Sequence, residues 1–176
     1  ELDNILTIPF LGDIPRHGTR KGEDTDAIVV HESGRDSVSE AFRIIRTNME
    51  FMRVKSDNLQ VVMFTSANPG AGKTFVSSNL AMSIAQTNKK VVLVDVDIRK
   101  GTLSGIFSNV SGRMGLTHYL SGRTDGLDDI IGASEEYGKL DIIFSGPVPP
   151  NPAELLLSER FDRLITELRK RYDYII

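Results

Sequence analysis

The stretch SANPGAGKTF, residues 66–75, places two glycines, a lysine and a threonine between two apolar segments of different period. VVMFTS (61–66) is a short run of strand-forming residues, and residues 74 to about 87 carry apolar side chains at helical spacing. Strand, glycine-rich loop and helix in this order predict a loop at the carboxyl end of a parallel strand, where such sheets bind ligands. This feature restricts the fold class more than any other in the chain.

The chemistry of this loop is that of a phosphate-binding loop. Gly70 and Gly72 let the backbone curl so that successive N–H groups converge on an anion, and a helix beginning near Lys73 adds its positive end. Lys73 can then reach the β- and γ-phosphates of a nucleoside triphosphate, and the hydroxyl of Thr74 can ligate Mg²⁺. The predicted nucleotide-binding residues are Asn68, Pro69, Gly70, Ala71, Gly72, Lys73, Thr74 and Phe75.

Ala67 stands where the phosphate-loop motif usually has its first glycine. A small side chain fits there provided that the backbone does not need a positive φ. The alternative interpretation is a glycine-rich turn in which Lys73 and Thr74 have no ligand. The order of strand, loop and helix favours nucleotide binding.

A second group of polar residues ends the apolar run VVLVDVD (91–97). Residues two apart in a strand point to the same side, so Asp95, Asp97 and Arg99 can project together. Two carboxylates next to a triphosphate repel it unless a cation such as Mg²⁺ lies between them. One carboxylate can also accept the proton of an attacking phenol, whose pKa is about 10.

These residues complete the predicted site. The predicted catalytic residues are Lys73, Asp95 and Asp97, the predicted metal ligands are Thr74, Asp95 and Asp97, and Arg99 is a candidate phosphate or interface contact. The alternative is that one aspartate caps the next turn and Arg99 pairs with it.

The remaining segments alternate between helical and strand patterns. Apolar residues recur every three or four positions over 38–54, which predicts an amphipathic helix. Strands are expected at 140–145 and in the final YDYII, and short helical pieces at 102–107, 116–120 and 127–131. A last helix is expected to be capped by Asn151, opened by Pro152 and buried through Leu156, Leu157, Phe161, Leu164, Ile165 and Leu168. This alternation predicts an α/β fold, a doubly wound and mostly parallel sheet covered on both faces.

Composition bounds the organisation and excludes several classes of site. With 176 residues, 40% of them hydrophobic, the chain is long enough for one well-buried domain. The net charge of −3 gives no basic field for nucleic acid, and the lack of cysteine excludes disulfides and thiolate metal sites. We expect the scattered His17, His31 and His118 to be structural or solvated. No apolar run approaches the roughly 20 residues that span a bilayer.

The two ends of the chain differ in pattern from its middle. Residues 1–36 have the glycine and proline content of a linker, so the domain is expected to occupy 37–176. Because the chain begins with Glu1 and stops inside an expected strand, we expect a piece of a longer protein.

Four motifs lie in a fixed order: EAFRIIRTN (40–48), SANPGAGKTF (66–75), VVLVDVDIRKG (91–101) and SGPVPPNPAELL (145–156). Together they resemble the bacterial tyrosine kinases, P-loop autokinases that control the chain length and export of capsular polysaccharides and exopolysaccharides. The segment PFLGDIP (9–15) is similar to the one that follows the second membrane helix in fused members, which implies an upstream membrane region. On its own, SGPVPPNPAELL indicates only a rigid turn.

The resemblance implies a P-loop NTPase fold of the MinD/ParA-like type that uses ATP and Mg²⁺. It places Lys73 and Thr74 on the nucleotide and the metal. It assigns Asp95 and Asp97 to a second Walker-like motif, which supports the metal and activates the acceptor tyrosine.

A further implication concerns assembly. Glu40, Arg43 and Arg46 match the E-x-x-R-x-x-R element through which neighbouring subunits of that family pack into a ring. The alternative from the residues alone is that Ser37 and Glu40 form a capping box and that the arginines are solvated.

Partners and missing parts are also implied. The expected partners are a transmembrane chain-length regulator region, fused or separate, and a tyrosine phosphatase, with the domain tethered to the cytoplasmic side of the inner membrane. A Walker B aspartate and a tyrosine-rich tail would follow Ile176. Thr102 stands where part of the family has a tyrosine, and the tyrosines present are expected to be packing residues: Tyr119, Tyr137, Tyr172 and Tyr174.

The expected function is therefore ATP-dependent tyrosine autophosphorylation between subunits. One alternative is a positioning ATPase of the same fold, whose phosphate loop carries an additional lysine at the position of Asn68. The other is an ATP-responsive scaffold of a polysaccharide export machine.

Overall fold

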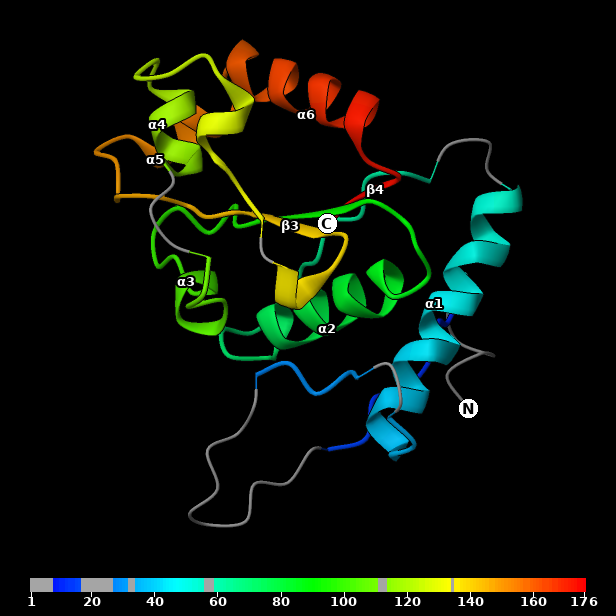
Figure 1. Ribbon diagram of the computed structural model, residues 1–176. Helices are drawn as coiled ribbons and strands as arrows, with labels where there is room; N and C mark the ends of the chain where they lie inside the picture. Colours follow the sequence, from blue (N-terminus) through cyan, green and yellow to red (C-terminus); the bar gives the residue numbers. More distant parts are fainter. Residues whose placement is uncertain (1–7, 17–26, 32–33, 56–58, 111–113, 134) are drawn as a thin grey trace.

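A computed structural model describes residues 8–16, 27–31, 34–55, 59–110, 114–133 and 135–176 (Figure 1). Its centre is a sheet with the strand order β2–β3–β1–β4. The bounds are Ile131–Gly132 for β2, Leu140–Ile143 for β3, Val91–Val94 for β1 and Tyr174–Ile175 for β4. β1 pairs in parallel with β3, from Val91↔Leu140 to Val94↔Ile143, and in parallel with β4 on its other side. The expected mostly parallel sheet is confirmed.

Helices cover both faces of this sheet (Figure 1). On one side lie α1 (Ser37–Lys55) and α2 (Lys73–Ala85), and on the other lie α4 (Leu116–Leu120), α5 (Pro152–Leu156) and α6 (Glu159–Arg171). The side chains of β1 alternate between two cores, because Val91 and Leu93 pack with α1 and α2 while Val92 and Val94 pack with α4 and α6. Burial on both faces explains the continuous apolar run of β1.

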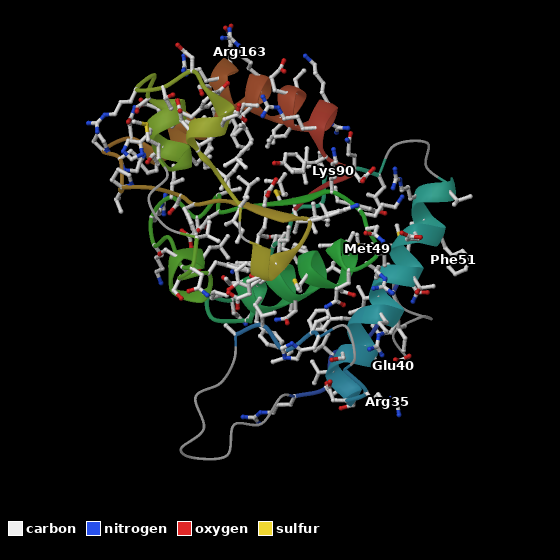
Figure 2. All side chains as sticks on the ribbon, viewed as in Figure 1. Arg35, Glu40, Met49, Phe51, Lys90 and Arg163 are labelled. Atoms are coloured by element: carbon white, nitrogen blue, oxygen red, sulfur yellow. The ribbon has the colours of Figure 1, made fainter. Side chains whose placement is uncertain are left out.

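The amphipathic pattern of α1 is realised as expected. Phe42, Ile45 and Met49 are buried in the core shared with α2. Phe51 is 66% exposed and points away from the body of the molecule, whereas Met49 points towards α2 (Figure 2).

Asp36 caps this helix. Its Oδ1 accepts the backbone N–H groups of Val38 and Ser39 at 3.0 and 2.9 Å, and its Oδ2 accepts the Ser39 hydroxyl at 2.6 Å. The alternative capping box of Ser37 and Glu40 is therefore wrong, because Ser37 is already the first helical residue.

Residues 27–31 pack against α2. The backbone N–H groups of Val29 and Val30 donate to Oδ1 of Asn79, at 2.8 and 3.2 Å, and the Asn79 amide donates to the carbonyl of Ala27 at 2.9 Å. Val29 and Val30 are buried in the core. Residues 1–7, 17–26 and 32–33 of the expected linker lie outside the described residues, so the boundary at residue 36 stays a prediction.

The expected strand at 61–66 is reduced to one bridge. Val61 pairs in parallel with Ile175, and the N–H of Val62 donates to the Ile175 carbonyl at 2.8 Å. The paired part of β4 ends at Ile175, so residues 63–66 have no ladder partner. Met63 is accordingly 85% exposed.

The expected last helix is broken in two. Pro152 opens α5 as expected, but the Asn151 amide donates to the Glu154 carboxylate at 2.8 Å instead of capping the helix. The backbone of Ser158 is extended and begins α6 anew, so Leu157 between the two helices is 87% exposed. The expectation that Leu157 is buried is wrong, whereas Leu164 and Leu168 are buried as expected.

Shorter elements connect these parts. The expected helical pieces appear as α3 (Leu103–Ile106), α4 and the 3-10 helix η2 (Leu127–Asp129), and a further 3-10 helix, η3, spans Glu135–Tyr137. The antiparallel edge strand β2, which pairs Ile131 with Ile143, was not expected.

Candidate functional site

A cavity of about 470 Å³ lies at the carboxyl end of β1. Lys73 and Thr74, the first residues of α2, contribute to its wall, as do Asp95 and Asp97, which follow β1 directly. These four residues meet because the carboxyl ends of parallel strands and the amino ends of the helices lie at the same edge of the sheet. The structure thus brings together every predicted catalytic residue and every predicted metal ligand.

The glycine-rich loop has the backbone conformation that its sequence predicts. Gly70 and Gly72 have φ values of 75° and 89°, in the left-handed region, and among the described residues, the chain neighbours aside, no atom lies within 4 Å of the position that a Cβ would take at either glycine. The glycines therefore serve backbone conformation, and the space beside them is open to a ligand. Ala67 does not have a positive φ, which meets the condition for its replacement of the motif's first glycine.

The ammonium group of Lys73 lies across the loop. It donates to the hydroxyl of Ser66 at 2.9 Å, and that hydroxyl donates to the carbonyl of Asn68 at 2.9 Å. Lys73 is exposed, so an anion in the loop can compete for its charge. Sequence reasoning did not assign a role to Ser66, because Ser66 lies one residue before the first position of the motif.

Asp95 is buried, with only 6% of the residue exposed, and each of its carboxylate oxygens accepts a hydrogen bond. Its Oδ1 accepts the N–H of Asp97 and its Oδ2 accepts the N–H of Leu103, both at 3.2 Å. Burial raises the pKa of Asp95 above its usual value, although these two hydrogen bonds oppose the shift. The alternative interpretation, in which one aspartate caps the next turn, is therefore partly correct, because Asp95 accepts the N–H of Leu103 at the start of α3.

Asp97 has a different environment although it is two residues away. It is exposed, and the N–H of Lys100 donates to its Oδ1 at 3.3 Å. Arg99 is also exposed and forms no ion pair with any residue that the structure describes, so the pairing of Arg99 with an aspartate, which the alternative interpretation required, is not found. Asp97 is thus the accessible carboxylate of the two.

The hydroxyl of Thr74 lies 3.2 Å from the hydroxyl of Thr102. Sequence reasoning did not place Thr102 in the site, because no motif spacing links the start of α2 to the start of α3. The contact exists because both helices begin at the same edge of the sheet.

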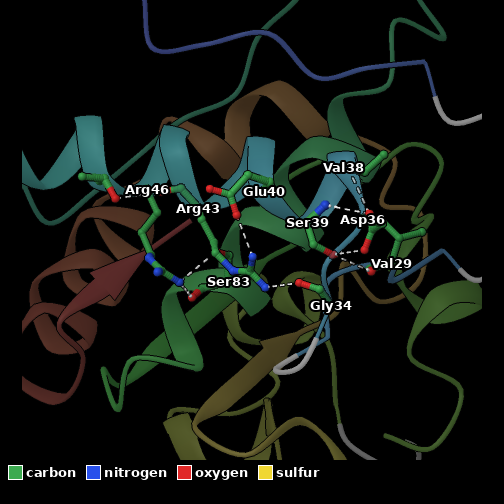
Figure 3. Close-up of polar contacts among 10 residues, drawn as sticks. Val29, Gly34, Asp36, Val38, Ser39, Glu40, Arg43, Arg46 and Ser83 are labelled. Carbon is green, nitrogen blue, oxygen red and sulfur yellow. Dashed lines mark hydrogen bonds and ion pairs between the residues drawn. The ribbon is translucent and has the colours of Figure 1, made fainter.

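The residues of the E-x-x-R-x-x-R element make contacts within the chain (Figure 3). Arg43 pairs with Glu40 at 2.7 Å and donates to the carbonyl of Gly34. Arg46 donates to the carbonyl and hydroxyl of Ser83, at 2.6 and 3.1 Å, and its burial lowers the pKa of its guanidinium. The Arg46 contacts hold α1 against α2, whereas those of Arg43 stay within α1 and the residues just before it, and the ring interface stays a prediction.

The segment that begins SGPVPP is fixed to α4. The carbonyls of Phe144 and Ser145 accept the N–H groups of Leu116 and Thr117 at 2.7 and 2.9 Å, and the Thr117 hydroxyl donates to the Pro147 carbonyl at 2.9 Å. A Cβ on Gly115 would lie 2.3 Å from the Cα of Gly146, so the backbones at these two positions can approach this closely only because residue 115 is glycine. These contacts fix residues 144–147, and the rigid turn that the residues indicate stays a prediction.

Two other expectations concern aromatic residues and histidines. Tyr119, Tyr172 and Tyr174 are buried, and Tyr137 packs edge-on against Phe107 with ring centroids 5.0 Å apart, so the tyrosines are packing residues as expected. His118 accepts the N–H of Gly115 at 3.0 Å, a structural contact, and His31 is exposed. His17 lies outside the described residues.

The donor set of the cavity fits Mg²⁺ bound together with a nucleotide. Asp95, Asp97 and Thr74 supply only oxygen atoms, which Mg²⁺ prefers, and Mg²⁺ in such sites completes its shell with phosphate and water. Among the described residues, no cluster of three histidines, cysteines or carboxylates could hold a metal alone. A cation here therefore depends on the nucleotide for part of its ligands.

A family model described as an AAA domain matches residues 59–176, which contain the loop, both aspartates and the cavity. The chain belongs to this family. A curated relative, a putative tyrosine-protein kinase in the cps region of Klebsiella pneumoniae, is 44% identical over 149 residues, or 85% of this chain and 20% of the relative. The chain thus spans about a fifth of the length of that relative.

Solved structures agree with this assignment. The kinase domain of the Escherichia coli tyrosine kinase ETK superposes with a TM-score of 0.77 at 38% identity, over 92% of this chain and 60% of that one. The chimerical protein CapA2B2 superposes with a TM-score of 0.83 at 36% identity, over 99% of this chain and 72% of that one. The chain is thus similar in sequence and fold to domains of bacterial tyrosine kinases, which confirms the resemblance carried by its four motifs.

The fold type is confirmed by a more distant likeness. The septum site-determining protein MinD from Pyrococcus horikoshii, solved with Mg-ADP, superposes with a TM-score of 0.56 at 25% identity, over 66% of this chain and 46% of that one. Kinship with these P-loop domains establishes a nucleotide-binding fold. Among the described residues, no helix combines the length and the apolar composition of a membrane span.

Proposed function

We propose that this domain is the catalytic part of an ATP-dependent protein-tyrosine autokinase that acts between subunits and regulates the chain length and export of capsular polysaccharide or exopolysaccharide. The observation that carries the proposal is the single cavity lined by Lys73, Thr74, Asp95 and Asp97. Kinship with proteins named tyrosine kinases, one of them in a cps region, supports the reaction and its setting.

ATP and Mg²⁺ are the proposed substrate and cofactor. The N–H groups of the loop at 68–72 and the amino end of α2 bind the phosphates, and Lys73 leaves Ser66 to neutralise them. Thr74 and the two aspartates hold the cation, which supplies further charge neutralisation on the phosphate oxygens when bound. Catalysis then rests on positioning and electrostatics, without a covalent enzyme intermediate.

The two aspartates take separate roles. Asp97 is exposed and accepts the proton of the acceptor phenol as its oxygen bonds to the γ-phosphorus and the bond to the leaving ADP oxygen breaks. Asp95, whose two oxygens each accept a backbone N–H, positions the loop that carries Asp97 and the start of α3. Arg99 is exposed beside Asp97 and is proposed to contact phosphate or a neighbouring subunit.

The acceptor is proposed to come from a neighbouring subunit's tyrosine-rich tail. The tyrosines of the described fold are buried or packed, so their hydroxyls do not face the cavity. Subunits are proposed to form a ring through the helix of Glu40, Arg43 and Arg46. The proposed partners are a transmembrane chain-length regulator region, which would tether the domain to the inner membrane, and a tyrosine phosphatase.

The test is incubation of the full-length protein with Mg²⁺ and γ-labelled ATP, followed by phosphosite mapping. Label is expected on tyrosines outside the described fold and is expected to be lost in Lys73→Met. Lys90→Met is the matched control, because Lys90 lies just before β1, at the opposite end of that strand, and should keep the label. Wild-type labelling by Lys73→Met would contradict the proposed role of the loop.

The second candidate function is a MinD-like positioning ATPase, favoured by the likeness to MinD. Its phosphate loop would need an additional lysine where this chain has Asn68. Release of free phosphate with no label on the protein would support this ATPase, and binding of ATP with neither product would support a scaffold.

A further inference from the structure

The contact between Thr74 and Thr102 joins two helices that begin 30 residues apart, α2 at Lys73 and α3 at Leu103. Their hydroxyl oxygens are 3.2 Å apart, within hydrogen-bond distance. Thr102 is the residue that precedes α3, yet its hydroxyl does not cap that helix. Among the described residues, Thr74 is the hydrogen-bond partner of the Thr102 hydroxyl.

The position of Thr102 is fixed by the two aspartates of the site. The carbonyl of Asp97 accepts the N–H of Gly101 at 2.9 Å, and the carboxylate of Asp95 accepts the N–H of Leu103 at 3.2 Å. Gly101 has a φ of 59°, and a Cβ on it would lie 2.4 Å from the Ser145 hydroxyl. Thr102 is thus held between two backbone positions that have little freedom.

A hydroxyl that ligates a cation needs an acceptor for its proton. Thr74 has one O–H donor and two lone pairs. When a lone pair is turned towards a cation, the proton points away from it and requires a partner. The oxygen of Thr102 is already in place to accept that proton.

We propose that Thr102 is a positioning residue for Mg²⁺: it accepts the Thr74 proton and so keeps the lone pairs of Thr74 directed into the cavity. The inference rests on the proposed function, because it requires that Thr74 ligate the cation of a nucleotide complex. It adds a residue outside the phosphate loop and outside the aspartate pair, acting through Thr74 and not on the substrate.

The test compares Thr102→Val with Thr102→Ser in the full-length protein. Valine has nearly the same shape but no acceptor, whereas serine keeps the hydroxyl. The measurement is binding of a fluorescent ADP, first with EDTA and then over a titration of Mg²⁺. Thr102→Val is expected to raise the Mg²⁺ concentration at half-saturation by roughly 10- to 100-fold, as for the loss of an outer-shell partner of a metal ligand, and to leave the affinity in EDTA unchanged. Thr102→Ser is expected to behave like wild type.

Two controls separate this role from a structural one. Thr166→Val, on α6, removes an exposed hydroxyl that donates to the carbonyl of Asp162 in the same helix and is not part of the cavity wall, so it should change neither affinity. Thr102→Ala, with a smaller side chain, repeats the test if valine disturbs the start of α3.

Several results would overturn the inference. They are an unchanged Mg²⁺ half-saturation in both Thr102→Val and Thr102→Ala, or an equal loss of affinity with and without Mg²⁺. A wild-type protein that binds ADP with no dependence on Mg²⁺, or that binds no nucleotide, would instead remove the proposed function together with the inference.

Discussion

Asp95 and Asp97 show how two identical side chains two residues apart acquire different environments. Both follow β1, but Asp95 is turned into the protein, where two backbone N–H groups hold it, and Asp97 is exposed. The sequence spacing predicts that both reach the site. The difference in burial between them depends on the backbone of the turn that follows β1, and the spacing does not encode that backbone.

The residue-scale prediction concerns Asp97. Replacement by asparagine keeps the shape and the contact with Lys100 but removes the base, so tyrosine phosphorylation should fall by about 10²- to 10⁴-fold. Because Asp97 is exposed, the free energy of unfolding should change by less than about 0.5 kcal/mol. Initial rates of phosphate incorporation and urea unfolding measure the two effects, and a variant with an unaltered rate would remove Asp97 as the base.

At the scale of elements, α1 depends on polar contacts at its start and in its middle. The carboxylate of Asp36 accepts N–H groups in the first turn of α1 that have no partner within the helix. Arg46 reaches the carbonyl of Ser83 in the last turn of α2, where carbonyls lack a partner within the helix and a cation is favoured. These contacts fix the helix that carries the expected ring interface.

The cap predicts a dependence of stability on pH. Hydrogen bonds from the Ser39 side chain and backbone lower the pKa of Asp36 from 3.8 to about 2. The folded state thus holds the carboxylate better than the unfolded state does, so the stabilisation is present above about pH 4 and is lost as the pH falls towards 2. Asparagine can also cap a helix but carries no charge, so it lacks the part of the stabilisation that depends on the ionised carboxylate, and the stability advantage of wild type over Asp36→Asn should shrink from pH 5 to pH 3. Urea midpoints of both proteins test this, and a constant difference would speak against it.

A second prediction at this scale separates packing from assembly. Arg46→Ala leaves the buried Ser83 without its donor and should cost about 1–3 kcal/mol of stability. Glu40→Ala removes an exposed ion pair and should cost less than about 1 kcal/mol. If α1 forms the ring interface, both variants should reduce assembly in sedimentation experiments. An intact ring in Glu40→Ala would refute the interface.

At the scale of the whole molecule, most of the sheet and the site could be predicted, because buried parallel strands and a phosphate loop have strong local patterns. The order of strand, loop and helix around Lys73 predicted the edge of the sheet at which the cavity lies. What could not be predicted depends on contacts between distant segments. β2 is two residues long and has no periodicity, and the exposure of Leu157 follows from a backbone break at Ser158 that apolar spacing does not reveal. The contact of Thr102 with Thr74 likewise arises only when two helices begin side by side.

In the proposed function, phosphate passes from ATP bound in this cavity to tyrosines of another subunit. The most direct measurement mixes full-length wild-type protein with a longer, affinity-tagged Lys73→Met protein, adds Mg²⁺ and γ-labelled ATP, and maps the label on each chain by mass. Label is expected on tyrosines of the Lys73→Met chain only when wild type is present. A Lys73→Met chain that stays unlabelled beside a labelled wild type would contradict transfer between subunits.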